Sequence, residues 1–172
     1  MNQSEQRKFA EGVLARDLGE GCYWAIAASL SGSDIDALIA EMSRLPPKVS
    51  GLWAEWMLRE SNATRPQKDW LCLFVVGSKC AESAANAVGF ASLSENAGMV
   101  QSLVNLIFDS QDPMFAYTAM RGKNITPDQR GELFNLVVRS GNKQVMLFAL
   151  TDFDILTYGQ RCAMHYALSV SD

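Results

Sequence analysis

Histidine and cysteine side chains carry much of the acid–base, nucleophilic and metal chemistry of proteins, and this sequence has few of them. His165 is the single histidine and lies three residues after Cys162, so the two side chains would be one turn apart on a helix. Such a pair supplies only half of a zinc site, and the other cysteines, Cys22, Cys72 and Cys80, form no Cys-x-x-Cys pair. The spacing therefore predicts no metal site and buried, reduced cysteines.

Two carboxylates stand close together at Asp152 and Asp154, which is the residue type needed for an acid pair or a metal-binding loop. About 30 residues earlier the same positions hold Gly122-Lys123-Asn124, so this segment is better explained as a connecting turn. No phosphate-binding loop, nucleophile elbow or metalloprotease helix motif is present. The sequence predicts a protein that is not an enzyme and has no cofactor; an active site built on His165 or on the Asp152–Asp154 pair is the alternative.

The elements that would position any site recur about every 30 residues. Thr126-Pro127-Asp128-Gln129-Arg130 is echoed by Thr157-Tyr158-Gly159-Gln160-Arg161, and in both segments a Thr can cap a helix whose third residue is a reciprocating Gln. Upstream, the matching positions are Leu103, Asn105, Leu106, Ser110, Ala119 and Ile125 with Leu133, Asn135, Leu136, Ser140, Ala149 and Ile155. A fainter copy begins at Leu71. This period is typical of helical-hairpin arrays, whose units bury their apolar faces against neighbours.

Helical periodicity and capping residues predict an all-α chain. The expected helices are 3–17, 22–30, 34–44, 48–60, 67–77, 80–91, 95–109, 113–121, 127–139, 143–150 and 158–169. The segment Gly32-Ser33-Asp34-Ile35 is expected to form a loop like that at Gly122-Lys123-Asn124-Ile125.

Over residues 71–172, where the repeats are clearest, the pattern resembles the broad class of α-solenoid and HEAT-like hairpin repeats. The resemblance implies a single domain, 1–172, arranged as a right-handed stack of about five antiparallel helix hairpins plus a C-terminal helix. It also implies an extended surface that binds other macromolecules.

Composition narrows the classes of function. The chain has 172 residues, a net charge of −4 and a hydrophobic fraction of 48%, as expected for a globular protein. The acidic balance argues against general nucleic-acid binding, which requires a basic surface over the phosphates. The sequence shows neither a secretory signal nor a membrane-spanning run, so we expect a soluble, cytoplasmic protein without membrane contacts.

Charge is distributed unevenly along the chain. No basic residue lies between Arg16 and Arg44, and five acids are predicted to form a partner-binding patch there: Asp17, Glu20, Asp34, Asp36 and Glu41. A basic cluster follows later, at Arg121, Lys123, Arg130, Arg139 and Lys143. Separated patches of this kind can steer complementary partners, and solvated loops and helix ends are the alternative explanation.

Aromatic residues offer a second candidate surface. Trp53 and Trp56 share one face of a predicted helix, and tryptophan is enriched where proteins bind one another. The pair is therefore a candidate partner-binding site, with packing inside the core as the alternative.

These observations favour a non-enzymatic protein–protein interaction module, either an adaptor or a stoichiometric inhibitor. Its acidic patch would suit a partner with a basic surface; one instance would be a phage-type inhibitor of a nucleic-acid-binding host defence complex. The alternative is a nucleic-acid-binding helical-repeat module that uses the basic cluster of residues 121–143. A monomer is expected in preference to a homodimer.

Overall fold

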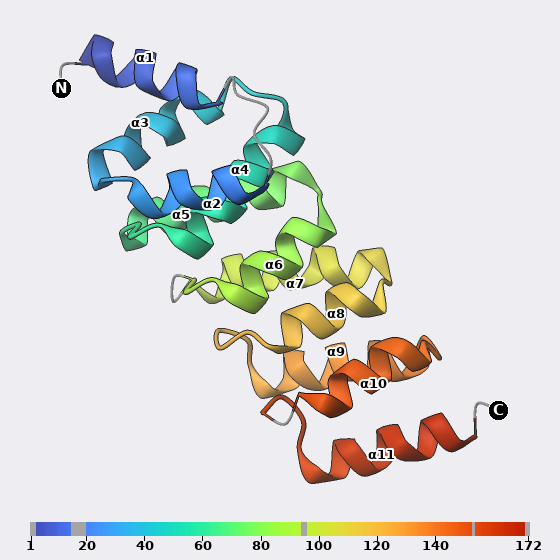
Figure 1. Cartoon of the computed structure of the whole chain (residues 1–172). Helices are drawn as coiled ribbons and strands as arrows, with labels where there is room; N and C mark the ends of the chain where they lie inside the picture. Colours follow the sequence, from blue (N-terminus) through green and yellow to red (C-terminus); the bar gives the residue numbers. More distant parts are fainter. Residues whose placement is uncertain (1–2, 15–19, 94–95, 153, 171–172) are drawn as a thin grey trace.

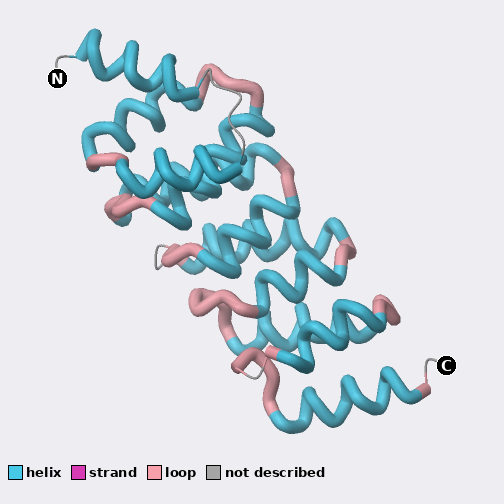
Figure 2. The backbone as a smooth tube through the Cα atoms, viewed as in Figure 1, coloured by secondary structure: helices cyan, strands magenta, loops and turns pink. Residues whose placement is uncertain are grey.

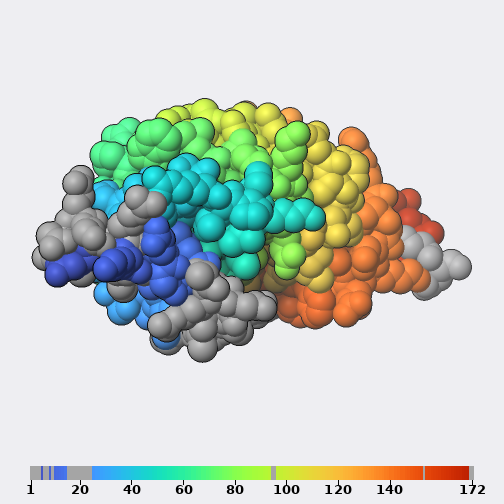
Figure 3. Space-filling view, turned by 90° about the horizontal axis from the view of Figure 1, so that it is seen from above, coloured from blue at the N-terminus to red at the C-terminus, as the bar shows by residue number. Residues whose placement is uncertain are grey.

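The computed structural model describes residues 3–14, 20–93, 96–152 and 154–170, and these form eleven helices without a strand (Figures 1 and 2). The helices are stacked in layers along one long axis, with the two chain ends at opposite ends of the stack (Figure 1). The space-filling view shows the same order, from the N-terminal layers at one end to the C-terminal layers at the other (Figure 3). The all-α prediction is confirmed.

The helix bounds lie close to those expected from the sequence. They are α1 Gln3–Leu14, α2 Glu20–Ser29, α3 Gly32–Met42, α4 Pro47–Glu60, α5 Arg65–Ser78, α6 Ala81–Phe90, α7 Ala97–Ser110, α8 Pro113–Met120, α9 Pro127–Arg139, α10 Lys143–Thr151 and α11 Tyr158–Ser169. Among the described helices, none combines the length and the apolar character needed to cross a bilayer.

One expected loop is wrong. Gly32–Ile35 is the first turn of α3, because Ser31 and Asp34 form a reciprocal capping box that starts the helix two residues earlier than predicted. The same device starts α5, α9 and α11, where Thr64, Thr126 and Thr157 cap their helices. The helix starts predicted at the last two threonines are confirmed.

The turn that follows each longer helix is also repeated. The hydroxyls of Ser78, Ser110 and Ser140 each donate to the backbone carbonyl three residues earlier, at 2.6 to 2.7 Å. Each hydroxyl oxygen then accepts from the backbone N–H two residues later. The intervening residues have positive φ: 54° at Lys79, 54° at Gln111 and 66° at Gly141. Three successive turns therefore have one geometry.

Packing arranges the helices in two columns. In the odd column, each helix from α1 to α9 contacts the next odd helix, and the column ends at α11. In the even column, each helix from α2 to α8 contacts the next even helix, and the column ends at α10. The most extensive contacts between columns join α4 with α5, α6 with α7 and α8 with α9. Each layer is thus covered by the layers before and after it.

Equivalent positions of the odd helices fill the core. Leu38, Leu71, Leu103, Leu133 and Met164 stand at one register position of α3, α5, α7, α9 and α11, and all five are fully buried. Their spacing of about 30 residues explains the period seen in the sequence. Burial of these large side chains supplies much of the stability of the stack.

Glycines permit a close approach within the even column. A Cβ atom added to Gly89 of α6 would lie 2.3 Å from the carbonyl oxygen of Thr118 in α8. One added to Gly122, just after α8, would lie 2.2 Å from the carbonyl oxygen of Val88. Both contacts involve backbone atoms, so the two helices lie too close for any larger residue at these positions.

The repeated Thr-x-x-Gln motif also connects layers. Gln67 caps α5 through its side-chain oxygen, while its Nε2 donates to Gly32 O at 2.8 Å and to Asp36 Oδ1 at 2.7 Å in α3. In the same way Gln129 caps α9 and donates to Gln101 Oε1 of α7 at 2.7 Å. The motif is a structural joint between odd helices.

Candidate protein-binding surface

A cluster of aromatic and arginine side chains crosses the even column, and we call Trp56, Arg59, Phe90 and Arg121 the aromatic–arginine surface. The guanidinium of Arg59 lies 4.6 Å from the centre of the Trp56 ring and 5.2 Å from that of Phe90. Arg121, at the end of α8, lies over the same Phe90 ring at 5.1 Å. Helices α4, α6 and α8 each contribute, so the cluster forms only when three layers are stacked.

Glu55 anchors one end of this surface. Its side chain accepts a bond from Arg59 Nη1 at 3.2 Å and further hydrogen bonds from Ser83 and Asn86 of α6. Glu55 is only 2% exposed, and burial raises the pKa of its carboxyl group above the ordinary value of 4.5, although its hydrogen bonds and the charge of Arg59 act in the opposite direction. A buried acid that orients an arginine across an aromatic ring is a costly arrangement for a surface with only a packing role.

Two N–H donors at the aromatic–arginine surface lack acceptors. Trp56 Nε1 and Arg59 Nε are buried and have no hydrogen-bond partner among the described residues. The nearest carboxylate to the second donor, Glu60 Oε1, is 3.9 Å away, beyond hydrogen-bonding distance. Buried donors are normally paired, so these two mark a place where an acceptor from outside the chain would be stabilising once the side chains that cover the donors move aside.

A cavity of about 530 Å³ opens beside these donors. Its walls come from α4 and from the start of α6; they comprise Lys48, Leu52, Glu55, Trp56, Arg59, Cys80, Glu82, Ser83 and Asn86. Leu52 of α4 is exposed in its wall, and Phe90 is exposed at the far end of α6. The cavity therefore combines apolar wall positions with charged and amide groups that can orient a bound segment.

An ion pair closes the other end of the surface. Arg121 Nε lies 3.2 Å from Asp152 Oδ2, at the C-terminal end of α10. Burial raises the pKa of the Tyr117 hydroxyl, and the neighbouring Asp152 charge raises it further. Tyr117 therefore stays protonated and can donate to that carboxylate. Asp152 pairs with Arg121 at the end of α8, whereas Asp154 is exposed.

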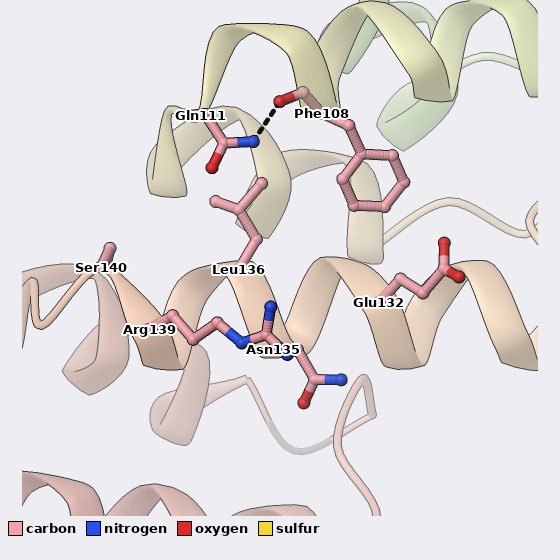
Figure 4. Close-up of a pocket in the computed structure, with 7 residues that line it drawn as sticks. All are labelled: Phe108, Gln111, Glu132, Asn135, Leu136, Arg139 and Ser140. Atoms are coloured by element: carbon pink, nitrogen blue, oxygen red, sulfur yellow. Dashed lines mark hydrogen bonds between the residues drawn. The ribbon is translucent and has the colours of Figure 1, made fainter.

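A second hollow, of about 470 Å³, lies on the odd column (Figure 4). Phe108 and Gln111 come from the end of α7, and the close-up shows the Phe108 ring directed toward α9 (Figure 4). Gln111 is turned back to donate to the carbonyl of Phe108. Leu136 and Arg139 of α9 form the opposite wall. This hollow offers little for specific binding, since its polar groups belong to helix ends and to the exposed surface.

The described side chains of the predicted acidic patch each have a partner within the chain. Asp34 is used in the cap of α3, and Asp36 accepts from Gln67 of α5. Glu41 pairs with Arg44 and lies two turns beyond Asp34 on the same side of the helix. Asp17 lies outside the described residues, as does the side chain of Glu20.

The predicted basic cluster is divided between the two ends of α9. Arg121, Lys123 and Arg130 lie near its start, whereas Arg139 is its last residue, about 14 Å along the helix axis from Arg130, and Lys143 begins α10. Arg130 Nη2 is also committed to the carbonyl of Gly122 at 2.8 Å. Arg161 makes the equivalent bond in the next layer, from its Nη2 to Asp152 O at 3.4 Å, and a second from its Nη1 to Leu150 O at 3.2 Å, so the arginine of the repeated motif serves the scaffold.

The two tryptophans of the predicted aromatic pair differ. Trp53 is 1% exposed and belongs to the core, so a binding role does not fit its position. Trp56 is half-buried and belongs to the aromatic–arginine surface. The sequence analysis missed Phe90, whose placement beside Arg59 depends on how α4 and α6 pack, and Trp70, which is 57% exposed on α5.

The cysteines also differ from one another. Cys72 is buried as expected, and burial raises the pKa of its thiol to about 12. Cys162 is exposed on α11, as is His165, so the expectation of burial is wrong for this cysteine. Among the described residues, no three His, Cys, Asp or Glu side chains are grouped so that they could hold a metal ion.

Comparison of the chain with protein-family models, with curated proteins and with solved structures finds no match.

Proposed function

We propose that this protein is a non-enzymatic protein-binding module, an adaptor or a stoichiometric inhibitor, which binds its partner through the aromatic–arginine surface. We further propose that the stacked layers form a right-handed α-solenoid of the HEAT-like kind. Such an array displays one continuous face from each column of helices. The even column then presents the binding face, and the capped starts of the odd helices hold the layers in register.

The observation that carries the proposal is the state of Arg59. Its guanidinium is held between two aromatic rings by the buried Glu55, and its Nε and the neighbouring Trp56 Nε1 are donors without acceptors. Tryptophan and arginine dominate the energetics of protein interfaces when they are ordered before binding. The matching partner segment would bring carbonyl or carboxylate oxygens to the donors and an apolar side chain to Leu52 and Phe90.

The acidic side of α3 suits the inhibitor form of this proposal. Asp34 and Glu41 lie on α3, the helix that directly precedes α4 of the aromatic–arginine surface. A partner with a basic groove could be steered by these charges and then held by the aromatic residues. Occupation of such a groove would exclude its nucleic acid without any chemistry.

The nucleic-acid alternative has weaker support. Arg130 is bonded to the scaffold, Arg121 is paired with Asp152, and the remaining basic residues are divided between two ends of a layer. Phosphate binding needs several free cations along one track. The enzyme alternative also has weaker support, because its candidate residues are not grouped: Asp152 faces α8, whereas His165 is exposed on α11.

Affinity purification from the native cell with quantitative mass spectrometry tests the proposal. The baits are the wild-type chain, Phe90→Ser and Trp70→Ser; both substitutions remove an exposed aromatic ring, but only the first lies on the aromatic–arginine surface. We expect a stoichiometric partner that Trp70→Ser retains and Phe90→Ser loses. Titration with the purified partner should give at least about a tenfold loss of affinity for Phe90→Ser and for Arg59→Ala.

Two results would reject the proposal. One is equal recovery of the partner by both variants, which would place its binding site elsewhere. The other is salt-dependent binding of DNA or RNA that charge reversal of Lys123, Arg139 and Lys143 abolishes, because that behaviour belongs to the nucleic-acid alternative.

A further inference from the structure

The last helix, α11, is held to the stack by less buried surface than α9, the helix that it follows in the odd column. Figure 1 shows α11 at the end of the stack. Met164 is the only buried residue among the described residues of α11, whereas five residues of α9 are buried. The contact of α10 with α11 is also less extensive than those of α4 with α5, α6 with α7 and α8 with α9. Leaving the stack therefore costs α11 less than it would cost α9.

The polar joint that connects earlier odd helices is missing at α11. The capping Gln129 of α9 donates to Gln101, which lies five residues after the N-cap of α7. The joint between α5 and α3 has the same register. The corresponding residue of α9 is Gly131, five residues after its N-cap, and it has no side chain that could accept a hydrogen bond. Gln160 completes the capping box of α11, but this position of α9 offers it no side-chain acceptor.

Arg161 connects α11 to the end of α10 and, through it, to the aromatic–arginine surface. Its Nη1 donates to Leu150 O at 3.2 Å, and its Nη2 donates to Asp152 O at 3.4 Å. The carboxylate of Asp152 lies 3.2 Å from Arg121 Nε, and the Arg121 guanidinium stacks over Phe90 at 5.1 Å. Arg161 is therefore a positioning residue, because it holds the backbone from which Asp152 reaches Arg121.

The ion pair at the end of this chain of contacts is weak by itself. The side chains of Arg121 and Asp152 are 44% and 23% exposed, so water screens the attraction between them. When α11 leaves the stack, Arg161 leaves with it, and the backbone that carries Asp152 loses two hydrogen bonds. The pairing of Arg121 then depends on a segment that is no longer held in place.

We propose that α11 opens and closes on the end of the folded stack, and that its closed position keeps Arg121 paired with Asp152. Opening frees the Arg121 guanidinium to pair with an oxygen of a partner, so α11 acts as a lid on the outer end of the aromatic–arginine surface. A partner that pairs with Arg121 would in turn favour the open state. This regulatory role rests on the proposed function, whereas the movement of α11 does not.

Native-state hydrogen exchange of the full chain, followed by mass spectrometry, tests the movement. The backbone amides of α11 should exchange faster than those of α7 and α9, under conditions in which those helices stay protected. Gly131→Gln restores the missing acceptor and should slow the exchange of α11 about fivefold, the factor that one net hydrogen bond supplies. Gly131→Ala is the matched control, because its added Cβ meets no atom within 4 Å and brings no acceptor, so α11 should exchange as in the wild type.

Arginine modification tests the link between α11 and the surface. Phenylglyoxal, which reacts with free guanidinium groups, should modify Arg121 severalfold faster in Arg161→Ala than in the wild type, as measured by peptide mapping. Asp152→Asn should give the same increase, and combining the two substitutions should add nothing, because both act through one ion pair. The rate at Arg59 should stay unchanged and serves as the control for general loosening of the fold.

Three results would overturn the inference. They are exchange of α11 at the rate of α7, equal exchange of α11 in Gly131→Gln and Gly131→Ala, and a reactivity of Arg121 that Arg161→Ala leaves unchanged. Failure to recover any partner by affinity purification would instead reject the proposed function. Both measurements on α11 use the chain alone, so they decide its movement in either case.

Discussion

The odd and even columns are built from similar layers of helices but differ in how their polar groups are paired. At the starts of odd helices α5 and α9, each glutamine both caps its helix and bonds to the layer before it, so the polar groups are paired. On the even column, Glu55 and Arg59 are held together against aromatic rings, and two buried donors remain without acceptors. In the odd column, where the capping motif repeats, these polar groups are paired. In the even column, where no such motif repeats, two donors lack acceptors. We propose that the odd column contributes mainly stability and that the even column carries the binding surface.

The largest effect should come from the close approach of α6 and α8, which brings the layers of the even column together. Gly89→Ala places a methyl group against the carbonyl of Thr118, and we expect the free energy of unfolding to fall by about 3 kcal/mol. Urea unfolding followed by circular dichroism measures this loss. Gly131→Ala in α9 is the control: no atom lies within 4 Å of its added Cβ, so it should raise stability by up to about 1 kcal/mol. Equal effects of the two changes would show that the approach is not tight.

The next effect concerns Glu55, whose loss should damage the even column alone. Glu55→Ala removes the partner of Arg59 and leaves Ser83 and Asn86 without their acceptor, so we expect a loss of about 2 kcal/mol by urea unfolding. Glu60→Ala is a control on the same helix, because its carboxylate is 3.9 Å from Arg59 and it should cost less than about 0.5 kcal/mol.

The same residue makes a prediction about pH. Because burial raises the pKa of Glu55 in the folded state, the folded protein binds more protons than the unfolded chain at pH values above 4.5. The stability of the wild type relative to Glu55→Gln should therefore be highest near this pH and decline as pH rises through the raised pKa. A difference in stability that stays constant with pH would show that the carboxyl titrates normally.

A smaller loss of stability is expected at the glutamines of the odd column, and it should be larger at Gln129, which connects two layers, than at Gln160 in the last helix. Gln129→Ala removes the reciprocal bond of the α9 capping box and the bond to Gln101, and we expect a loss of about 1.5 kcal/mol. Gln160→Ala removes the reciprocal bond of the α11 capping box and should cost about 0.5 kcal/mol. Thermal unfolding of the two variants under one condition gives the ratio, and a larger effect at Gln160 would contradict the role of Gln129 as a joint between layers.

The smallest effect is expected at the outer end of the aromatic–arginine surface. Arg121→Lys keeps the charge beside Asp152 but loses the planar stacking on Phe90, so stability should fall by about 0.5 kcal/mol or less. Affinity for the partner should fall more than stability does. If stability and affinity fall by equal amounts, Arg121 serves the fold and not the binding surface.

Local signals in the sequence were sufficient for the helices. Thr126 with Gln129, and Thr157 with Gln160, predicted helix starts that the structure confirms, because a capping box is built from residues three apart. The same signal is present at Thr64 and Gln67, but the helix was predicted to begin at residue 67, two residues after the start of α5.

The aromatic–arginine surface could not be predicted in the same way. Arg59 and Phe90 are 31 residues apart in the numbering, and their contact exists only because α4 packs on α6. Glu55 had no distinctive pattern in the sequence, since an acid one turn before an arginine is common on exposed helices. Its burial comes from the next layer, which a single helix cannot reveal. The prediction for Trp56 placed one member of the surface, and Trp53 was assigned with it because both lie on the same helix.

The joints between odd helices have a mechanical meaning. The bonds from Gln67 to α3 and from Gln129 to α7 join neighbouring layers. Stretching the stack along its length would therefore break these short-range hydrogen bonds one after another. Apolar contacts between layers would yield more gradually than these links. Under tension, individual layers of such a protein would detach one at a time while the other layers stay folded.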